Sequence, residues 1–381
     1  MIYLDNAATS FPKPEGVYIA LDRFARHTLA NPGRAGHKMA LAAERTLDDG
    51  RHRLNRFFNG RTPDRWIFTL NCTDALNMAF KGVLNAGDHV ITSDLEHNSV
   101  SRPLVAMAEA GKISLTRVPS DASGTIDPAA ILAAFTPQTK LVAITHASNV
   151  LGTVQPVDEI GKLVRGRDAL FLVDAAQSAG VIPVDVQAFC IDLLAFPGHK
   201  SLFGPTGTGA LYVGPRAQLR PWREGGTGGD SSSPTQPTEF PHNLEGGTPN
   251  VLGVAGLIAG LDFVEERGLD AIRHHELELC DRLRLALAEL PGFNVFGHGD
   301  RTRRVGTVSF RCEIIPDSDI IGASLDSFNI AVRAGMHCAP YVHKAVGSYP
   351  DGLVRVSPGP FNTLAEIDTL VAALQEVTTG I

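Results

Sequence analysis

Between residues 65 and 213, short apolar runs alternate with amphipathic stretches of helical length. The runs are nearly continuous rather than alternating, as expected for strands that are buried on both faces of a sheet. They predict seven strands, at 66–69, 89–93, 113–116, 140–145, 169–173, 193–196 and 209–213. This pattern indicates an α/β domain with a mostly parallel sheet flanked by helices.

After residue 250 the apolar spacing becomes helical and then short strands follow. The expected helices are 251–266, 272–290 and a closing helix at 364–377, and the expected strands are 305–310, 330–333 and 353–357. Gly268 and Pro291-Gly292 provide the stop signals of the first two helices. We therefore expect two domains: a large one over residues 1–255, which includes the N-terminal segment, and a smaller C-terminal α+β domain over residues 256–381.

The stretch 224–249 has neither pattern. It is rich in Gly, Ser, Pro and Thr. On composition alone, such a stretch predicts a linker or a disordered loop between the two domains.

Composition and charge narrow the class of partner. The chain has 381 residues, 44% of them hydrophobic, and a formal net charge of −7 with no basic run, which argues against nucleic acid or an anionic membrane as partner. No basic segment followed by an apolar stretch opens the chain, and no run of about eighteen apolar residues occurs. We therefore expect a cytoplasmic protein with a small-molecule substrate. The five cysteines show neither metal-ligand spacing nor a disulfide pattern, so no metal site is expected.

Lys200 lies in the glycine-rich segment Phe196–Gly209, next to His199. A lysine forms a Schiff base with the aldehyde of pyridoxal phosphate when its amine is reachable, partly desolvated and often neutral. Glycines on both sides let the backbone approach a flat ring. A solvated loop lysine is the alternative, since most lysines in glycine-rich stretches are of that kind.

Asp174 ends the apolar run 169–173 and lies 26 residues before Lys200. A carboxylate at a strand end can hold the pyridinium nitrogen of the cofactor protonated, which keeps the ring a strong electron sink. The alternative is an aspartate that caps a following helix. Gln177, in the same turn, could donate to the phenolic oxygen of the cofactor.

Two further strand ends carry candidate cofactor contacts. Thr73 follows the strand predicted at 66–69, where it is both a plausible helix N-cap and a plausible phosphate ligand, and His199 can add a donor. His97 follows the strand predicted at 89–93. Its imidazole could lie flat on the pyridine ring and move protons near neutral pH, although loop histidines are more often merely solvated.

Near the C-terminus, Cys338 is flanked by His337 and lies close in sequence to Arg333, surroundings that favour a thiolate. The other four cysteines are better explained as small buried apolar residues. Arg355 lies among apolar residues of a predicted strand, where a guanidinium needs a carboxylate. That carboxylate could belong to a structural salt bridge or to an amino-acid substrate.

Taken together, these motifs resemble the class V aminotransferase family of fold-type I pyridoxal phosphate enzymes, and within it the cysteine desulfurase and selenocysteine lyase-like branch. The resemblance runs nearly end to end. It is carried by Tyr3–Thr9 (YLDNAAT), Asn31–His37 (NPGRAGH), Glu96-His97, Ser148–Thr153 (SNVLGT), Asp174–Gln177 (DAAQ), Gly198–Lys200 (GHK), Glu245–Asn250 (EGGTPN), Arg333–Cys338 (RAGMHC) and Arg355–Thr363.

The resemblance implies pyridoxal 5'-phosphate as cofactor and a role for each site residue. Lys200 would hold the cofactor, Asp174 its pyridinium nitrogen and Gln177 its phenolic oxygen, and His97 would stack on the ring. Thr73 and His199 would bind its phosphate, and Cys72 is a further expected cofactor contact. Thr248 would reach the phosphate of a neighbouring subunit, which implies a homodimer with a shared active site and makes the segment before it part of that site. Asn149 and Arg355 would hold the substrate carboxylate, and His37 is a further expected substrate contact.

By the same resemblance, the reaction converts L-cysteine to L-alanine and leaves the sulfur on Cys338 as a persulfide. Lys200 takes the α-proton, and a sulfur-acceptor protein, as in iron-sulfur cluster assembly, collects the sulfur. The alternatives are a class V aminotransferase and a lyase acting on selenocysteine or another β-substituted amino acid.

The chain departs from the usual pattern of this branch at three positions. Met336 replaces the first of two histidines, Pro197 stands where a serine is frequent, and Cys72 stands where a small residue or threonine is common. Only 16 residues separate Cys338 from Arg355, which predicts a short, ordered cysteine loop to which an acceptor must come.

Overall fold

The computed structural model describes residues 1–33, 36–228 and 232–379. Two residues of the 31–37 motif, Arg34 and Ala35, therefore lie outside the described residues, as do three residues of the 224–249 stretch. Within the described ranges, none of the helices combines the length and the apolar character needed to cross a membrane.

The large sheet has seven strands in the order β2-β8-β7-β6-β5-β3-β4. β8 runs antiparallel to both of its neighbours and the other pairs are parallel, which confirms the mostly parallel sheet. The strands are β2 (Trp66–Thr69), β3 (His89–Ser93), β4 (Ser114–Val118), β5 (Thr139–Thr145), β6 (Leu170–Asp174), β7 (Leu193–Pro197) and β8 (Gly209–Val213). Their ends differ from the predicted ones by no more than about two residues, within the usual scatter of strand assignments.

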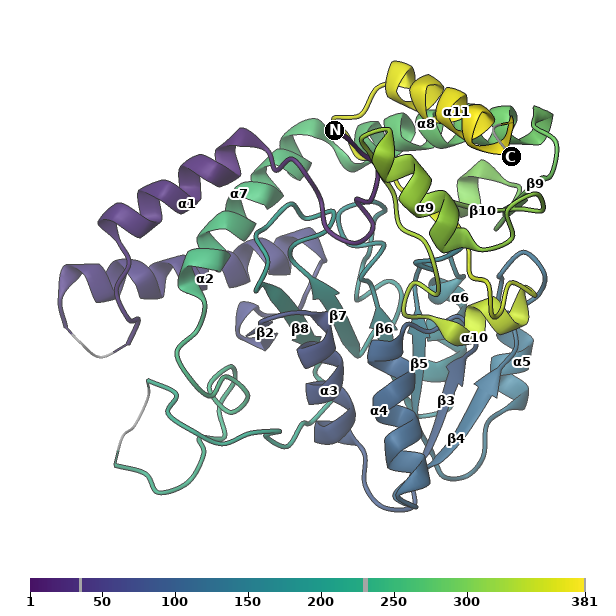
Figure 1. Cartoon of the computed structure of the whole chain (residues 1–381). Helices are drawn as coiled ribbons and strands as arrows, with labels where there is room; N and C mark the ends of the chain where they lie inside the picture. The colour runs from purple at the N-terminus through teal and green to yellow at the C-terminus, as the bar shows by residue number, and fades with distance from the viewer. Residues whose placement is uncertain (34–35, 229–231, 380–381) are drawn as a thin grey trace.

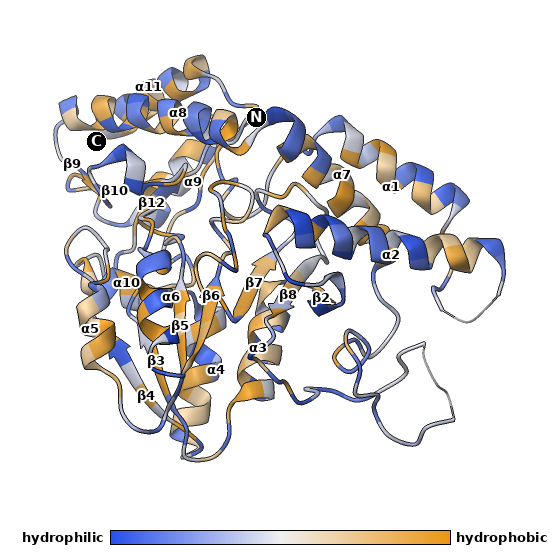
Figure 2. Ribbon diagram, turned by 180° about the vertical axis from the view of Figure 1, so that it is seen from behind, coloured by the Kyte–Doolittle hydropathy of each residue, from blue (hydrophilic) through white to orange (hydrophobic). Residues whose placement is uncertain are grey.

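Helices cover both faces of this sheet, which is why its strands are apolar throughout. α3 (Cys72–Val83) and α4 (Asn98–Glu109) lie on one face, and their apolar residues form one core cluster with the sheet. α5 (Pro128–Ala133) and α6 (Val157–Arg165) lie on the other face and belong to a second cluster. In Figure 2 the strands β6 and β7, at the centre of the sheet, are mostly hydrophobic.

Three long helices form a layer beside the sheet (Figure 1). α1 (Glu15–His27) and α2 (Lys38–Phe57) pack on α7 (Val251–Arg267), which leads towards the C-terminal part of the chain. α7 ends at Gly268, whose φ of 82° favours glycine, as the predicted stop signal requires.

The C-terminal part contains a three-stranded antiparallel sheet in the order β12-β10-β9, with a core of its own. Its elements are α8 (Leu269–Glu289), β9 (Phe293–Phe296), β10 (Val308–Cys312), α9 (Ser318–Ser327), β11 (Ile330–Ala331), α10 (Pro340–Ala345), β12 (Val354–Val356) and α11 (Leu364–Thr379). The strand predicted from 305 begins three residues later because Gly306 lies in a bend.

The start of the chain lies against this C-terminal part. β1 (Ile2–Tyr3) pairs in parallel with β11, and Leu4 belongs to the C-terminal core cluster. The predicted division at residue 255 falls inside α7. The two-domain division stays a prediction, but the N-terminal segment is shared between both parts.

The end of the 224–249 stretch is tightly held, so its interpretation as a disordered linker is wrong there. Leu244 is fully buried. The Glu245 carboxylate lies 2.6 Å from Nη2 of Arg51 and accepts a 2.7 Å hydrogen bond from the backbone N–H of Phe68. These contacts fix the chain just before Thr248.

Candidate active site

A cavity of about 140 Å³ lies at the carboxyl ends of the parallel strands. It brings together most of the predicted site residues, from segments far apart in the chain. Its lining includes Asn71, Cys72, Thr73, His97, Ser99, Asn149, Asp174, Gln177, His199 and Lys200. Ligands gather at this edge of α/β sheets because the strand-end loops converge there.

Lys200 follows β7, and its side chain is partly buried at the cavity. Burial, together with the positive charge of Arg355, lowers the pKa of its amine to about 8. The backbone of the Lys200 loop is held by the N-terminal segment, since the Ser10 hydroxyl donates to the Lys200 carbonyl at 2.9 Å. The amine is therefore available in its neutral, nucleophilic form near neutral pH.

Asp174 ends β6, as predicted, and is 2% exposed. Its Oδ1 accepts a 2.9 Å hydrogen bond from the N–H of Ala176 and lies 3.6 Å from Sγ of Cys72. No helix starts here among the described residues, so the alternative of a helix cap is wrong. Burial raises the pKa of this carboxyl, and a cation beside it would restore its charge.

The first turn of α3 lines the cavity, but its cap is not Thr73. Oδ1 of Asn71 accepts the N–H of Asp74 at 2.8 Å, so Asn71 is the N-cap and the predicted cap at Thr73 is wrong. Thr73 lies in the first turn, where its hydroxyl is 2.7 Å from that of Ser99. A helix N-terminus with a hydroxyl in its first turn suits a phosphate group.

His97 caps α4 through its own ring. Nδ1 accepts the N–H of Ser99 at 3.1 Å, which leaves the ring proton on Nε2. Burial and the charge of Lys200 lower the pKa of His97 to about 4, so the ring is neutral at physiological pH. A neutral ring in this cavity can stack on a flat cofactor and donate one proton.

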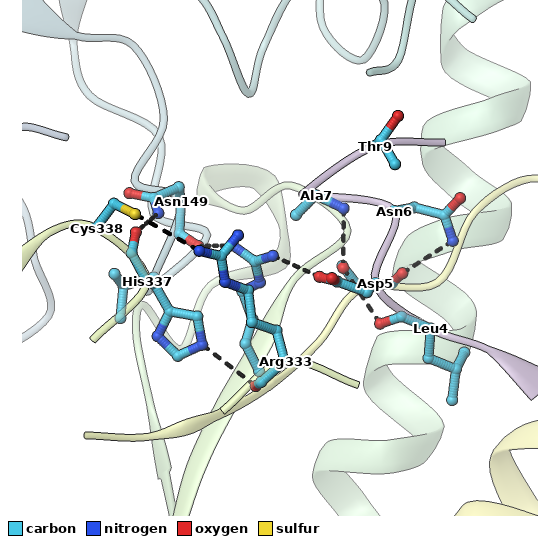
Figure 3. A network of polar contacts seen from close by, with 12 residues as sticks. Leu4, Asp5, Asn6, Ala7, Thr9, Asn149, Arg333, His337 and Cys338 are labelled. Carbon is cyan, nitrogen blue, oxygen red and sulfur yellow. Dashed lines mark hydrogen bonds and ion pairs between the residues drawn. The ribbon is translucent and has the colours of Figure 1, made fainter. Parts of the chain in front are cut away.

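The cysteine loop is held by two hydrogen bonds. The amide of Asn149, in the cavity wall, donates to the His337 carbonyl at 2.8 Å (Figure 3). The backbone N–H of Asn98 donates to the Cys338 carbonyl at 2.7 Å. His337 and Cys338 both have left-handed backbone conformations, with φ of 50° and 57°. Such a pair is strained for residues other than glycine and needs tethers of this kind.

The charge next to the thiol comes from Arg333 and not from His337, contrary to the expectation that both residues contribute. Nη2 of Arg333 lies 3.5 Å from Sγ of Cys338. The His337 ring instead stacks on His343, with centroids 5.6 Å apart. Burial, with Arg355 nearby, lowers the pKa of His337 to about 2, so this ring is uncharged.

Arg355 makes the structural salt bridge that its sequence context allowed. Its side chain is 1% exposed, and Nη2 lies 2.6 Å from Oδ1 of Asp5. Nη1 donates to the backbone carbonyl of Asn149 at 3.0 Å, which joins Arg355 to the cavity wall. Nε is buried and has no hydrogen-bond partner in the described parts of the chain.

Four predicted site residues are not part of the cavity lining. Arg355 and the loop of Cys338 contact Asn149 in the cavity wall, whereas the other two predicted residues lie away from the cavity of this chain. His37 is exposed and caps α2, with Nδ1 accepting the N–H of Ala40 at 3.2 Å. Thr248 is exposed as well, and neither residue lines the cavity. The roles of His37 and Thr248 stay predictions.

Three residues of the site were not anticipated. Ser99 joins Thr73 and His97, and no sequence signal marks it. Lys13 donates to the His199 carbonyl at 2.7 Å, and Asp5 pairs with Arg355. Asp5 belongs to the Tyr3–Thr9 motif, so this motif was the available signal that the N-terminal segment reaches the site.

Comparison with known proteins agrees with the predicted fold and family. Residues 2–370 match the family model described as aminotransferase class V. The chain is similar to a probable cysteine desulfurase from Methanothermobacter thermautotrophicus, with 36% identity over 99% of this chain and 94% of the relative. It is also similar to a probable cysteine desulfurase from Halalkalibacterium halodurans, with 37% identity over 99% of this chain and 93% of the relative.

Among solved structures, the apo cysteine desulfurase from Thermococcus onnurineus has a TM-score of 0.94 and 34% identity, covering 100% of this chain and 95% of that one. The cysteine desulfurase CsdA from Escherichia coli, in an S-sulfonic acid form, has a TM-score of 0.89 and 29% identity, covering 100% of this chain and 95% of that one. These matches confirm the fold and the family predicted from the motifs, and the chain belongs to the class V aminotransferase family.

Proposed function

We propose that this protein is a cysteine desulfurase that uses pyridoxal 5'-phosphate, converts L-cysteine to L-alanine and transfers the sulfur to Cys338. The observation that carries the proposal is a tethered cysteine beside a cavity that is lined by a partly buried lysine. Asn149 lines the cavity of Lys200 and also binds the loop of Cys338. The relatives named cysteine desulfurase, which match over almost the whole chain, support the same activity.

The residues of the cavity fit the proposed cofactor. His199 Nδ1 is buried and has no partner in the described parts of the chain, and the start of α3 offers amide and hydroxyl donors for a phosphate. We assign Lys200 to the covalent link, Asp174 to the pyridinium nitrogen, and Thr73 and His199 to the phosphate. Cys72, whose Sγ lies 3.6 Å from Asp174, is a further contact of the cofactor.

Gln177 and His97 complete this assignment. Gln177 uses one amide hydrogen on the Ala7 carbonyl, at 3.1 Å, and its other amide hydrogen would donate to the phenolic oxygen. His97 would stack on the ring. When bound, the cofactor stabilises the negative charge that develops at the substrate α-carbon.

The chain itself supplies substrate positioning and proton transfer. Arg355 and Asn149 hold the substrate carboxylate, which orients the α-hydrogen and the sulfur of L-cysteine. The Lys200 amine, with a pKa of about 8, removes the α-proton and later returns a proton to the product.

The sulfur step takes place at Cys338. Its thiolate attacks the sulfur of L-cysteine, a sulfur–sulfur bond forms, and the bond between Cβ and sulfur breaks with its electron pair left on the carbon side. Protonation of Cβ then gives L-alanine, and Cys338 carries the persulfide. Arg333, 3.5 Å from the attacking sulfur, stabilises the negative charge on it before the attack.

Two partners belong to the proposal. A second copy of the chain would bring Thr248 to the phosphate of this cavity, and the contacts of Glu245 with Arg51 and Phe68 hold the backbone three residues before it. A sulfur-acceptor protein would collect the persulfide sulfur. Because the Cys338 loop is tethered by Asn98 and Asn149, the acceptor must approach the cysteine.

The test compares wild-type holoenzyme with Cys338→Ser, using Cys190→Ser as the control. L-cysteine, L-selenocysteine and cysteine sulfinate are supplied separately, alanine is measured, and the persulfide is trapped and identified by mass. We expect Cys338→Ser to keep the absorption of the bound cofactor and to lose the persulfide and alanine formation from L-cysteine. Alanine and sulfide formation by Cys338→Ser at the wild-type rate would contradict the proposal and favour a lyase without a cysteine nucleophile. Formation of a keto acid would favour an aminotransferase.

A further inference from the structure

Asp5, in the N-terminal segment, forms an ion pair with Arg355, the residue to which we assign the binding of the substrate carboxylate. The backbone around Asp5 is fixed beside β12, because the Ser357 N–H donates to the Leu4 carbonyl at 2.7 Å and the Asn6 N–H donates to the Ser357 carbonyl at 3.1 Å. Asp5 thereby reaches Arg355 from the side of the chain's first residues.

The pair is close and largely shielded from water. Oδ1 of Asp5 lies 2.6 Å from Nη2 of Arg355, and the two side chains are 20% and 1% exposed. In the described parts of the chain, Asp5 is the only carboxylate within ion-pair distance of Arg355. A buried guanidinium without a partner is strongly unfavourable, so Asp5 satisfies Arg355 when no substrate is bound.

An incoming α-carboxylate meets this arrangement directly. It must either displace the Asp5 carboxylate from Arg355 or share the guanidinium with it at close range. Displacement gives up a charge-assisted hydrogen bond, and sharing brings two like charges together in a poorly hydrated place. Both routes weaken the binding of any amino acid at Arg355.

We infer that Asp5 is an internal competitor of the α-carboxylate, which lowers the affinity for amino acids and speeds the release of L-alanine. The inference rests on the proposed role of Arg355 as the carboxylate-binding residue. Asp5 is then a positioning residue that acts through Arg355, and its negative charge weakens the binding of the substrate carboxylate. If Asp5 had a purely structural role, its removal would misplace Arg355 and weaken amino-acid binding instead of strengthening it.

The test is Asp5→Asn in the holoenzyme, which removes the charge but keeps an oxygen that can accept from Arg355. We expect the dissociation constant of L-alanine, measured by calorimetry, to fall on the order of fivefold to tenfold. KM for L-cysteine should fall by a similar factor, and kcat should also fall because the product leaves more slowly. An unchanged or raised dissociation constant for L-alanine would overturn the inference.

A matched control is Asp281→Asn, which removes a carboxylate 2.8 Å from the buried guanidinium of Arg304 in the C-terminal part. This variant should bind L-alanine like the wild type. L-alaninamide, which has no carboxylate, should bind Asp5→Asn and wild type equally. Equal tightening for the amide would show a general effect and would also overturn the inference.

Stability gives a second, independent measurement. Without ligand, Asp5→Asn should have a lower Tm than wild type, and L-alanine should raise its Tm more than it raises that of wild type, because the ligand supplies the missing partner of Arg355. If Asp5→Asn is obtained as folded protein only in the presence of L-alanine, the inference is supported. If it is not folded with or without L-alanine, the inference is refuted. L-alanine binding is measured without turnover. If wild type failed to desulfurate L-cysteine, the proposed function would be rejected, but the effect of Asp5 on L-alanine binding would still be measured.

Discussion

Nη2 of Arg333 lies 3.5 Å from Sγ of Cys338, and this is the cationic contact of the thiol in the described parts of the chain. Its neighbour in sequence, His337, is neutral and stacks on His343. A guanidinium at this distance stabilises negative charge on sulfur, which the proposed attack on L-cysteine requires. We therefore expect the reactivity of Cys338 to depend on Arg333.

Arg333→Gln should slow the alkylation of Cys338 by iodoacetamide at pH 7 by roughly threefold to tenfold, because the stabilising charge is lost. Persulfide formation from L-cysteine should slow by a similar factor. Mass spectrometry of the peptide that contains Cys338 measures both rates. Arg311→Gln is the control, since Arg311 is an exposed residue of β10. Equal alkylation rates in Arg333→Gln and wild type would show that the contact has no chemical role.

Lys200→Met should abolish activity yet stabilise the cofactor-free protein at pH 7. Burial lowers the pKa of Lys200 from 10.5 to about 8, so between these values the unfolded chain binds more protons than the folded chain. The free energy of unfolding of wild type therefore rises with pH across this window, and the full cost of the buried charge is present below pH 8.

Lys200→Met should raise the free energy of unfolding by about 1 to 3 kcal/mol at pH 7, because the loss of the attraction between Lys200 and Asp174 offsets part of the stabilisation. This increase should disappear as the pH approaches 10.5. Urea unfolding of the cofactor-free proteins at several pH values measures it. Lys162→Met, at an exposed position on α6, should show no such pH-dependent gain. A gain that is independent of pH would mean that packing, and not charge, is responsible.

The apolar pattern was sufficient to locate the seven strands of the large sheet, because a strand covered on both faces must be apolar throughout. It could not locate contacts between distant segments. Glu245 is held by Arg51 and Phe68, which precede it by almost the whole large domain, so composition alone suggested a linker there. The Asp5–Arg355 pair joins the two ends of the chain, and only the fold brings them together.

The predicted N-cap of α3 was wrong for a local reason. Asn71 and Thr73 are both good N-cap residues, and they stand two positions apart. Which of the two residues caps α3 depends on where β2 ends, and the pairing of β2 in the sheet determines that position. The candidate chemistry was more predictable than the cap, because strand-end residues of a parallel sheet converge on one edge.

Asn71→Ala should therefore affect mainly the stability of the protein, and Thr73→Ala mainly the binding of the cofactor. Asn71→Ala removes the cap of α3 and should lower the free energy of unfolding of the cofactor-free protein by about 1 kcal/mol. Thr73→Ala should change it by less than about 0.5 kcal/mol but should weaken cofactor binding, because it removes a proposed phosphate hydroxyl. Urea unfolding and cofactor titration of both variants serve as mutual controls. A larger loss of stability in Thr73→Ala would contradict the cap assignment.

Asn149→Ala should loosen the cysteine loop before any substrate is present. His337 and Cys338 hold left-handed conformations that cost roughly 1 to 2 kcal/mol each, and the Asn149 amide on the His337 carbonyl is one of their two tethers. Hydrogen exchange of residues 336–340 in the substrate-free holoenzyme should become faster, and persulfide formation should slow by roughly tenfold because the thiol is less well placed. Asn294→Ala, which removes a 2.9 Å hydrogen bond to Glu313 at the surface, should leave exchange in this loop unchanged. If exchange is unchanged in Asn149→Ala while KM for L-cysteine rises, Asn149 acts on the substrate alone and the loop is held by the Asn98 backbone.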